Sequence, residues 1–150
     1  MPISIADLQG LANELSEDGS TEAKLRASVS RSYYAAFHAL MPLAELLPPS
    51  SDARPNAKKI THHELESRLL EWLGSEESAV PAHRELRRQI AGTLQAARAA
   101  RVKADYRLDL DLTAGDAQSQ YHRARKLIRK VEEVLAPAPS LVSQVPSVGQ

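Results

Sequence analysis

The sequence has no cysteine and no hydrophobic run long enough to span a membrane. The absence of cysteine excludes a disulfide framework and a thiolate metal site, and it favours a reducing compartment. Met1 is followed by polar residues and a short amphipathic stretch, not by the charged and apolar regions of a signal peptide. We therefore expect a cytoplasmic protein without a membrane partner.

The chain also lacks a net charge, which taken alone argues against a nucleic-acid partner. The charges are unevenly distributed, however. Residues 1–83 carry seven Lys or Arg against twelve Asp or Glu, whereas residues 84–130 carry twelve against five. We predict one basic surface on a neutral molecule, a field that attracts phosphate. A strip at helical spacing either extends this surface or is the charged outer face of a helix: Arg123, Lys126, Arg129 and Lys130.

With 150 residues, the chain has the length of one domain, and no stretch alternates with period two for long enough to form a strand. Apolar residues recur at helical spacing in five segments, at about 4–16, 21–47, 61–73, 81–106 and 114–135. We predict an all-α fold, a single up-and-down bundle of about five helices over residues 1–136. A flexible tail rich in Pro, Ser and Val is expected at 137–150.

Core stripes and capping residues make these predictions specific. The second segment should bury Leu25, Val29, Tyr33, Ala36, Leu40 and Ala44. The fifth should bury Ala117, Tyr121, Ala124, Ile128, Val131 and Leu135. Helix starts of the capping-box type are expected at Ser4 with Asp7, at Thr61 with Glu64 and at Thr113 with Asp116. Residues 48–59 have the Pro, Ser and Asn content of an exposed loop.

An arginine, a tyrosine pair and a histidine lie in the middle of the second segment, in Arg31-Ser-Tyr-Tyr-Ala-Ala-Phe-His38. Arg31 and His38 are seven residues apart, which puts them about 20° from each other on one helix face. Their backbones are roughly 10.5 Å apart along the axis, so both reach one phosphodiester only if Arg31 bends or a partner chain supplies one of them. The structural alternative is that Tyr33 and Phe37 pack inside while Arg31 is solvated.

A second constellation, Arg98, Arg101, Asp105 and Tyr106, lies near the end of the fourth segment. Arg101 and Asp105 are four residues apart and can pair, with Arg98 on the same face. A structural salt bridge explains this pattern. Two arginines beside a tyrosine can also clamp a phosphate and stack a base, while Asp105 orients one guanidinium. These four residues are therefore candidates for binding RNA or a nucleotide.

Metal and cofactor motifs are not evident. A site at His62, His63 and Glu66 is not expected, because no further ligand lies within sequence range and both histidines occupy the first turn of a capped helix. The sequence has no Gly-rich phosphate loop, Walker sequence or nucleophile elbow. We expect neither a metal nor another cofactor.

Three motifs occur in the order and at the spacing found in small stand-alone bacterial HEPN proteins: the Arg31 to His38 motif, Lys59-Ile-Thr-His62-His63, and Arg101-Val-Lys-Ala-Asp105-Tyr106. From about residue 20 to 135, the chain resembles the HEPN superfamily. The resemblance implies a four- or five-helix bundle that is usually a dimer. Many such proteins are metal-independent endoribonucleases of toxin–antitoxin and phage-defence systems, often encoded beside a minimal nucleotidyltransferase.

The spacing from Arg31 to His38 matches the nuclease signature of the HEPN proteins. The implied roles are general acid–base catalysis for His38, charge stabilisation for Arg31 and substrate positioning for Tyr34. Many nuclease members carry the signature on the helix that corresponds to the fourth segment, where in this chain Arg101 is followed by Asp105 and Tyr106 and by no histidine.

Three hypotheses therefore stay open: a ribonuclease toxin, a non-catalytic HEPN module that binds a nucleotide or a partner nucleotidyltransferase, and a helical scaffold. We expect a homodimer, because a dimer would gather basic groups that one chain holds too far apart.

Overall fold

The computed structural model describes residues 2–55, 59–74 and 81–135. Its five helices are α1 (Ile5–Leu15), α2 (Glu22–Leu46), α3 (His62–Gly74), α4 (Pro81–Tyr106) and α5 (Ala114–Leu135). No strand occurs in the described ranges, which confirms the predicted all-α fold. None of these described helices combines the length and apolar character that crossing a membrane requires. The tail predicted at 137–150 lies outside the described residues.

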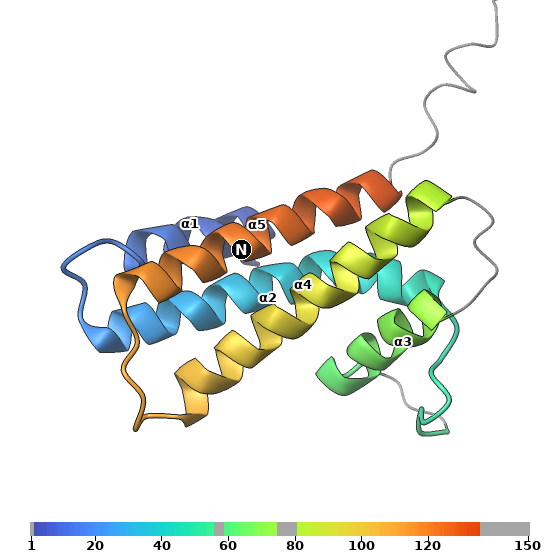
Figure 1. The fold of residues 1–150 in the computed structure, drawn as a ribbon, viewed down its shortest axis with the longest axis horizontal. Coiled ribbons are helices and arrows are strands. Elements are labelled where there is room, and N and C mark those ends of the chain that lie inside the picture. The colour runs from blue at the N-terminus through green and yellow to red at the C-terminus, as the bar shows by residue number, and fades with distance from the viewer. Residues whose placement is uncertain (1, 56–58, 75–80, 136–150) are drawn as a thin grey trace, which may run out of the picture.

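α2 is the central helix of the bundle (Figure 1). It contacts each of the other four helices, with α1 and α5 along one side, α4 crossing it, and α3 below its C-terminal half in this view. α4 packs on both α3 and α5. A side chain on α2 can therefore meet residues of α3 and α4 that are distant in the sequence.

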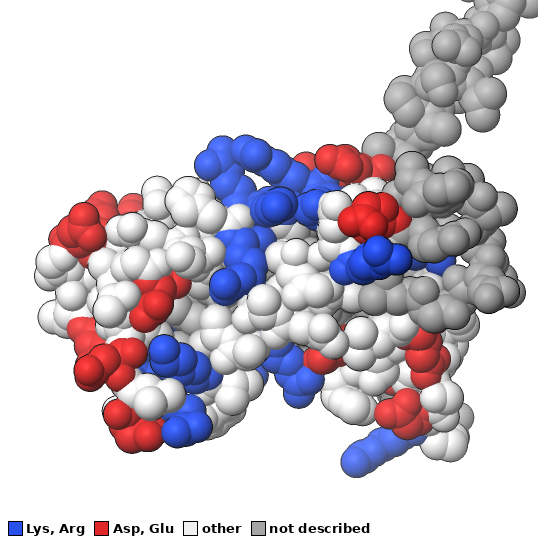
Figure 2. Space-filling model, in the orientation of Figure 1, with Lys and Arg blue, Asp and Glu red and all other residues white. Residues whose placement is uncertain are grey.

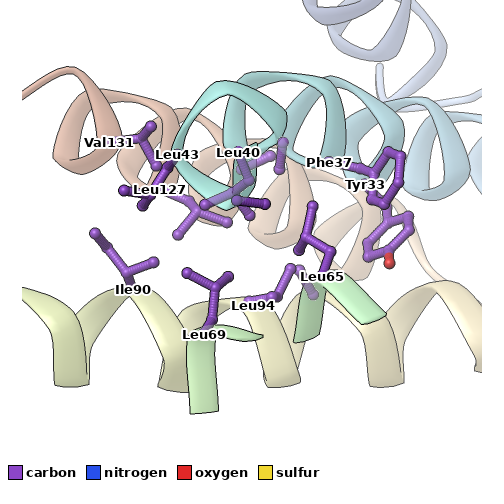
Figure 3. Packing of buried hydrophobic residues seen from close by; sticks show 14 residues of the cluster. Tyr33, Phe37, Leu40, Leu43, Leu65, Leu69, Ile90, Leu94, Leu127 and Val131 are labelled. Carbon is purple, nitrogen blue, oxygen red and sulfur yellow. The ribbon is translucent and has the colours of Figure 1, made fainter. Parts of the chain in front are cut away.

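The core lies where α2, α3, α4 and α5 meet, and Figure 3 shows their side chains converging on one another. Every position of the stripe predicted for α2, from Leu25 to Ala44, is buried. The other helices contribute Leu65, Leu69, Ile90, Leu94, Leu127 and Val131. Burying one large aliphatic side chain contributes about 1.5 to 3 kcal/mol, so this cluster is the main source of stability.

The buried face of α5 is wider than the stripe predicted from the sequence. Tyr121 and Leu135 are only half-buried, whereas the other four predicted positions are buried. Leu127 and Gln120 are fully buried although the predicted stripe left them out. The reason is that α1, α2 and α4 all contact α5 and together cover a broad arc of it. Gln120 fits there because its amide donates to the carbonyl of Ala97 at 2.8 Å.

Two helices begin at capping boxes that the sequence indicates. In α1, the Ser4 hydroxyl accepts from the amide of Asp7 at 3.0 Å, and the Asp7 carboxylate accepts from the amide of Ser4 at 2.9 Å. In α5, Thr113 and Asp116 make the same pair of bonds at 3.1 and 3.0 Å. These bonds satisfy amides at the helix starts that have no partner within the helix.

The start of α3 differs from the predicted capping box in one contact. The Thr61 hydroxyl accepts from the amide of Glu64 at 3.1 Å, as expected. The Glu64 carboxylate, however, accepts from the amide and hydroxyl of Ser50 at 2.8 and 2.6 Å and from Nε of Arg68 at 2.8 Å. A cationic donor and two further donors outcompete the backbone amide. Ser50 is buried, so the segment predicted as an exposed loop is held to α3 at this point.

Replacing Glu64 with Gln should remove a stabilising interaction that depends on pH. Burial raises the pKa of Glu64, but hydrogen bonds from Arg68 and Ser50 outweigh burial and lower its pKa from 4.5 to about 2. Because the folded-state pKa is lowered, the stabilisation is present above pH 4.5 and is lost as the pH falls toward 2. We expect Glu64→Gln to lower the free energy of unfolding by on the order of 3 kcal/mol at neutral pH, with the difference vanishing in acid.

Urea denaturation on both sides of pH 4.5 measures this difference. Glu45→Gln is the matched control, because Glu45 is exposed on α2 and its carboxylate forms no hydrogen bond or ion pair with the described residues; it should lower the free energy of unfolding far less than Glu64→Gln at neutral pH. A Glu64→Gln penalty that stays constant with pH would contradict the prediction.

Arg26 of α2 anchors the C-terminal end of α4. Its guanidinium donates to the carbonyl of Ala104 at 2.9 Å, to those of Lys103 and Arg107 at 3.3 Å, and to that of Leu110. These carbonyls include helix-end acceptors that lack a partner within the helix. Glu22 holds the same guanidinium at 2.9 Å. The last turns of α4 are thereby attached to α2, where the candidate site lies.

Candidate functional site

Arg101 is the centre of a polar cluster between α2 and α4. Its Nε donates to Oδ2 of Asp105 at 2.9 Å, and its Nη2 donates to the hydroxyl of Tyr34 at 3.4 Å. The other Asp105 oxygen accepts from the Ser30 hydroxyl at 2.5 Å. Only 16% of the Arg101 side chain is exposed. The carboxylate and the tyrosine hydroxyl therefore hold the guanidinium in one orientation.

Three tyrosine rings surround the Arg101 guanidinium. Its Cζ lies 5.7 Å from the ring centroids of Tyr33 and Tyr34 and 5.6 Å from that of Tyr106, all within range of a cation–π interaction. Burial acts to lower the pKa of Arg101, but Tyr34 and Asp105 outweigh burial and raise it. Tyr106 is 67% exposed, so much of its ring is accessible to a ligand.

His62, the first residue of α3, lies against the same tyrosines. Its Nδ1 shares a hydrogen bond of 3.0 Å with the hydroxyl of Tyr33. Burial lowers the pKa of His62, and the positive charges of Arg101, Arg98 and His38 lower it further. The imidazole is therefore neutral at pH 7, with one of its two ring nitrogens already bonded.

Arg98 brings a second guanidinium to this side of α4. It forms an ion pair with Glu66 of α3, and its own side chain is 38% exposed. The positive charge of Arg98 also lowers the pKa of His62, with a smaller effect than burial or the charge of Arg101. Arg98 and Arg101 therefore act on the same imidazole. We call the following residues the tyrosine–arginine cluster: Ser30, Tyr33, Tyr34, His62, Arg98, Arg101, Asp105 and Tyr106.

The cluster includes five of the seven site residues predicted from the sequence, and the exceptions are Arg31 and His38. Both of these side chains are exposed. Arg31 forms no hydrogen bond or ion pair with any residue that the structure describes. His38 lines a hollow together with residues of α1 and α5, among them Gln9 and Glu132. No hydrogen bond joins these two residues in the described structure, and His38 faces α1 and α5.

No family model, curated protein or solved structure matches this chain. Within the described residues, no group of three or more histidine and carboxylate side chains is arranged to hold a metal ion.

Ser30, Tyr33 and His62 were not among the site residues predicted from the sequence. The sequence predicts Tyr33 to be a core residue, and it is buried, but its hydroxyl also bonds His62. His62 belongs to the second of the three HEPN-like motifs, and this is the sequence feature that could have indicated its place in the site. Nothing local in the sequence indicates that the start of α3 lies against the middle of α2.

The cluster combines two guanidinium groups, an exposed aromatic ring and a neutral imidazole. A guanidinium has five N–H donors, and the contacts with Asp105 and Tyr34 use two of those on Arg101. Remaining donors can bind an anion such as phosphate, and an exposed ring can stack on a base. A neutral imidazole can accept a proton.

Proposed function

We propose that the protein binds RNA or a nucleotide through the tyrosine–arginine cluster. The observation that carries this proposal is the Arg101 guanidinium, held in one orientation among three tyrosine rings. The free donors of Arg101 and Arg98 fit a phosphate, and the ring of Tyr106 fits a base. Burial raises the pKa of Tyr33 and lowers that of His62, and such perturbed groups collect at functional sites.

A second candidate function is cleavage of the bound RNA without a metal, and His62 supports it. A neutral imidazole beside two guanidinium groups fits a general base for the ribose 2′-OH, and the guanidinium groups fit the charge of a phosphorane. The HEPN resemblance points to the same reaction but assigns it to Arg31, His38 and Tyr34. In this version the protein is an endoribonuclease toxin of a toxin–antitoxin or phage-defence system in the cytoplasm.

The alternative is a non-catalytic HEPN-like module that binds a nucleotide or a partner nucleotidyltransferase. Arg98 and Arg101 are each paired with a carboxylate, which fixes the orientation of the guanidinium. A guanidinium held in this way is suited to binding a ligand, and this favours the non-catalytic version. A homodimer belongs to both versions and would let one chain supply Arg31 and the other His38. Light scattering at micromolar concentration tests it, and a monomeric mass would contradict this part of the proposal.

Arg101→Lys should weaken binding of a labelled single-stranded RNA or a mononucleotide by at least about tenfold. Lysine keeps the charge but loses the planar fork that Asp105 and Tyr34 orient. Tyr106→Ala should also weaken RNA binding by roughly tenfold or more, because stacking contributes about 1 to 3 kcal/mol per base. Fluorescence anisotropy titration measures both effects.

Arg88→Lys is the matched control, since Arg88 lies on the same helix with its side chain 72% exposed. Thermal melting of each variant checks the fold, and the exposed Tyr106 can be replaced without opening the core. If Arg101→Lys and Tyr106→Ala bind as tightly as Arg88→Lys, the cluster is structural and the proposal is wrong.

A further inference from the structure

A separate hollow of about 550 Å³ lies between α4 and α5, two helices that contact each other and converge toward the right of Figure 1. It is lined by Gly92, Thr93 and Ala96 of α4 and by Ser119, His122, Arg123 and Lys126 of α5. The contribution of α4 consists of small side chains, so a ligand can approach the helix closely. A Cβ atom built at Gly92 would meet no atom within 4 Å, which shows that the floor is open there.

Arg123 has a defined direction at this hollow. Its Nη1 donates to Oε1 of Gln120 at 2.6 Å. Gln120 is fully buried and donates to the carbonyl of Ala97 at 2.8 Å, so it is locked in the core. A buried amide thereby orients Arg123, and the remaining N–H donors of the guanidinium stay available to a ligand.

The charge of the hollow is positive and uncompensated. Arg123 and Lys126 lie one turn apart, and none of the described residues that line the hollow is Asp or Glu. Lys130 follows on α5 and bonds Gln89 of α4. Figure 2 shows Lys and Arg side chains gathered over α5 on the face where α4 and α5 are seen. In the tyrosine–arginine cluster, by contrast, each arginine is paired with a carboxylate.

We propose that this hollow, the α4–α5 groove, binds the phosphodiester backbone of single-stranded RNA. From Arg123 to Lys130 the cations extend over seven residues, about 10.5 Å of helix, which is longer than one phosphate group and fits a chain of them. Arg123 and Lys126 contact phosphates, while the hydroxyls of Thr93 and Ser119 add neutral hydrogen bonds. The groove shares its class of ligand with the proposed function but none of its residues.

The test uses the full chain and a fluorescein-labelled single-stranded RNA, titrated by anisotropy at several salt concentrations. The double variant Arg123→Gln/Lys126→Gln should bind at least about tenfold more weakly. Its logarithmic salt slope should become shallower by about 1.4, because each lost phosphate contact removes about 0.7 for a single strand. The control Arg88→Gln/Arg125→Gln removes the same charge at exposed positions outside the groove and should change the affinity less than about twofold.

A second pair of variants tests the floor of the groove without disturbing the core. Gly92→Glu places a carboxylate in the path of the RNA and should weaken binding at least about tenfold. Gly92→Ala should bind within about twofold of the parent and melt at a higher temperature, because glycine is unfavourable inside a helix. Both side chains have open space at this position, so the variants should fold.

The outcomes separate this inference from the proposed function. Equal weakening by the groove variant and the charge-matched control would overturn it, as would an absence of RNA binding by the parent. If polyglutamate competes as strongly as unlabelled RNA, the ligand of the groove is an acidic protein. If the protein binds a mononucleotide and Gly92→Glu abolishes that binding, the ligand is a small phosphate compound. Either result would overturn the inference. If Arg101→Lys weakens RNA binding and the groove variants do not, the inference falls and the proposed function stands. If the groove variants weaken RNA binding and Arg101→Lys does not, the groove is the RNA-binding site and the proposed function of the tyrosine–arginine cluster is wrong.

Discussion

RNA cleavage in the presence of a chelator should fall by about 10²- to 10⁴-fold in a His62→Ala variant, as expected when a general acid–base is removed. The expectation rests on geometry and charge. The Tyr33 hydroxyl bonds Nδ1 of His62, and burial with the nearby guanidinium groups lowers the pKa of the imidazole. The ring is therefore neutral and oriented, and Nε2 has no hydrogen-bond partner among the described residues, so it remains for the ribose 2′-OH.

His63→Ala is the matched control for this experiment. His63 is the next residue of α3, but its side chain is 69% exposed and pairs with Asp52 outside the cluster. Its replacement should leave the rate unchanged. Cleavage rates of gel-purified RNA, recorded together with circular dichroism, separate a chemical effect from unfolding.

Arg31→Ala and His38→Ala are the competing variants, because the sequence predicts this pair as the catalytic one. If they abolish cleavage while His62→Ala retains it, the acid–base role belongs to His38. A parent protein that cleaves no RNA in the presence or absence of a chelator would remove the enzymatic version and leave the binding module.

Leu127→Ala should lower the free energy of unfolding by about 2 to 5 kcal/mol, the range for removing a large aliphatic side chain from a packed core. Leu127 has no exposed surface and belongs to the central cluster in which α2, α3, α4 and α5 meet. Figure 3 shows it among Leu40, Leu43 and Val131. Truncation leaves a cavity that four helices cannot all close, so the cost includes lost packing as well as lost burial.

Urea denaturation with Arg129→Ala as the control measures this cost. Arg129 is exposed on the same helix, and its replacement should cost less than about 1 kcal/mol. Ile128→Ala should cost toward the lower end of about 2 to 5 kcal/mol, because Ile128 packs in a smaller cluster with Leu8 and Ala35. Equal and small effects at Leu127 and Arg129 would show that the central cluster is misplaced.

The sequence by itself determined the helices of this protein and most of their ends. The α2 stripe and the capping boxes at Ser4 and Thr113 could be predicted because the contacts that decide them join residues three or four apart. The same local reasoning predicted the ion pair of Arg101 with Asp105, one helical turn away.

Only the tertiary structure decided which helix faces meet. Ser30 bonds Asp105 across 75 residues, Tyr33 bonds His62 across 29, and Gln120 bonds the carbonyl of Ala97 across 23. The same packing places His38 at a hollow beside α1 and α5, a position that helix periodicity does not reveal. Periodicity fixes a side chain's direction about its own helix axis, whereas its neighbours depend on how whole helices cross and pack, which is decided by the shape of the complete core.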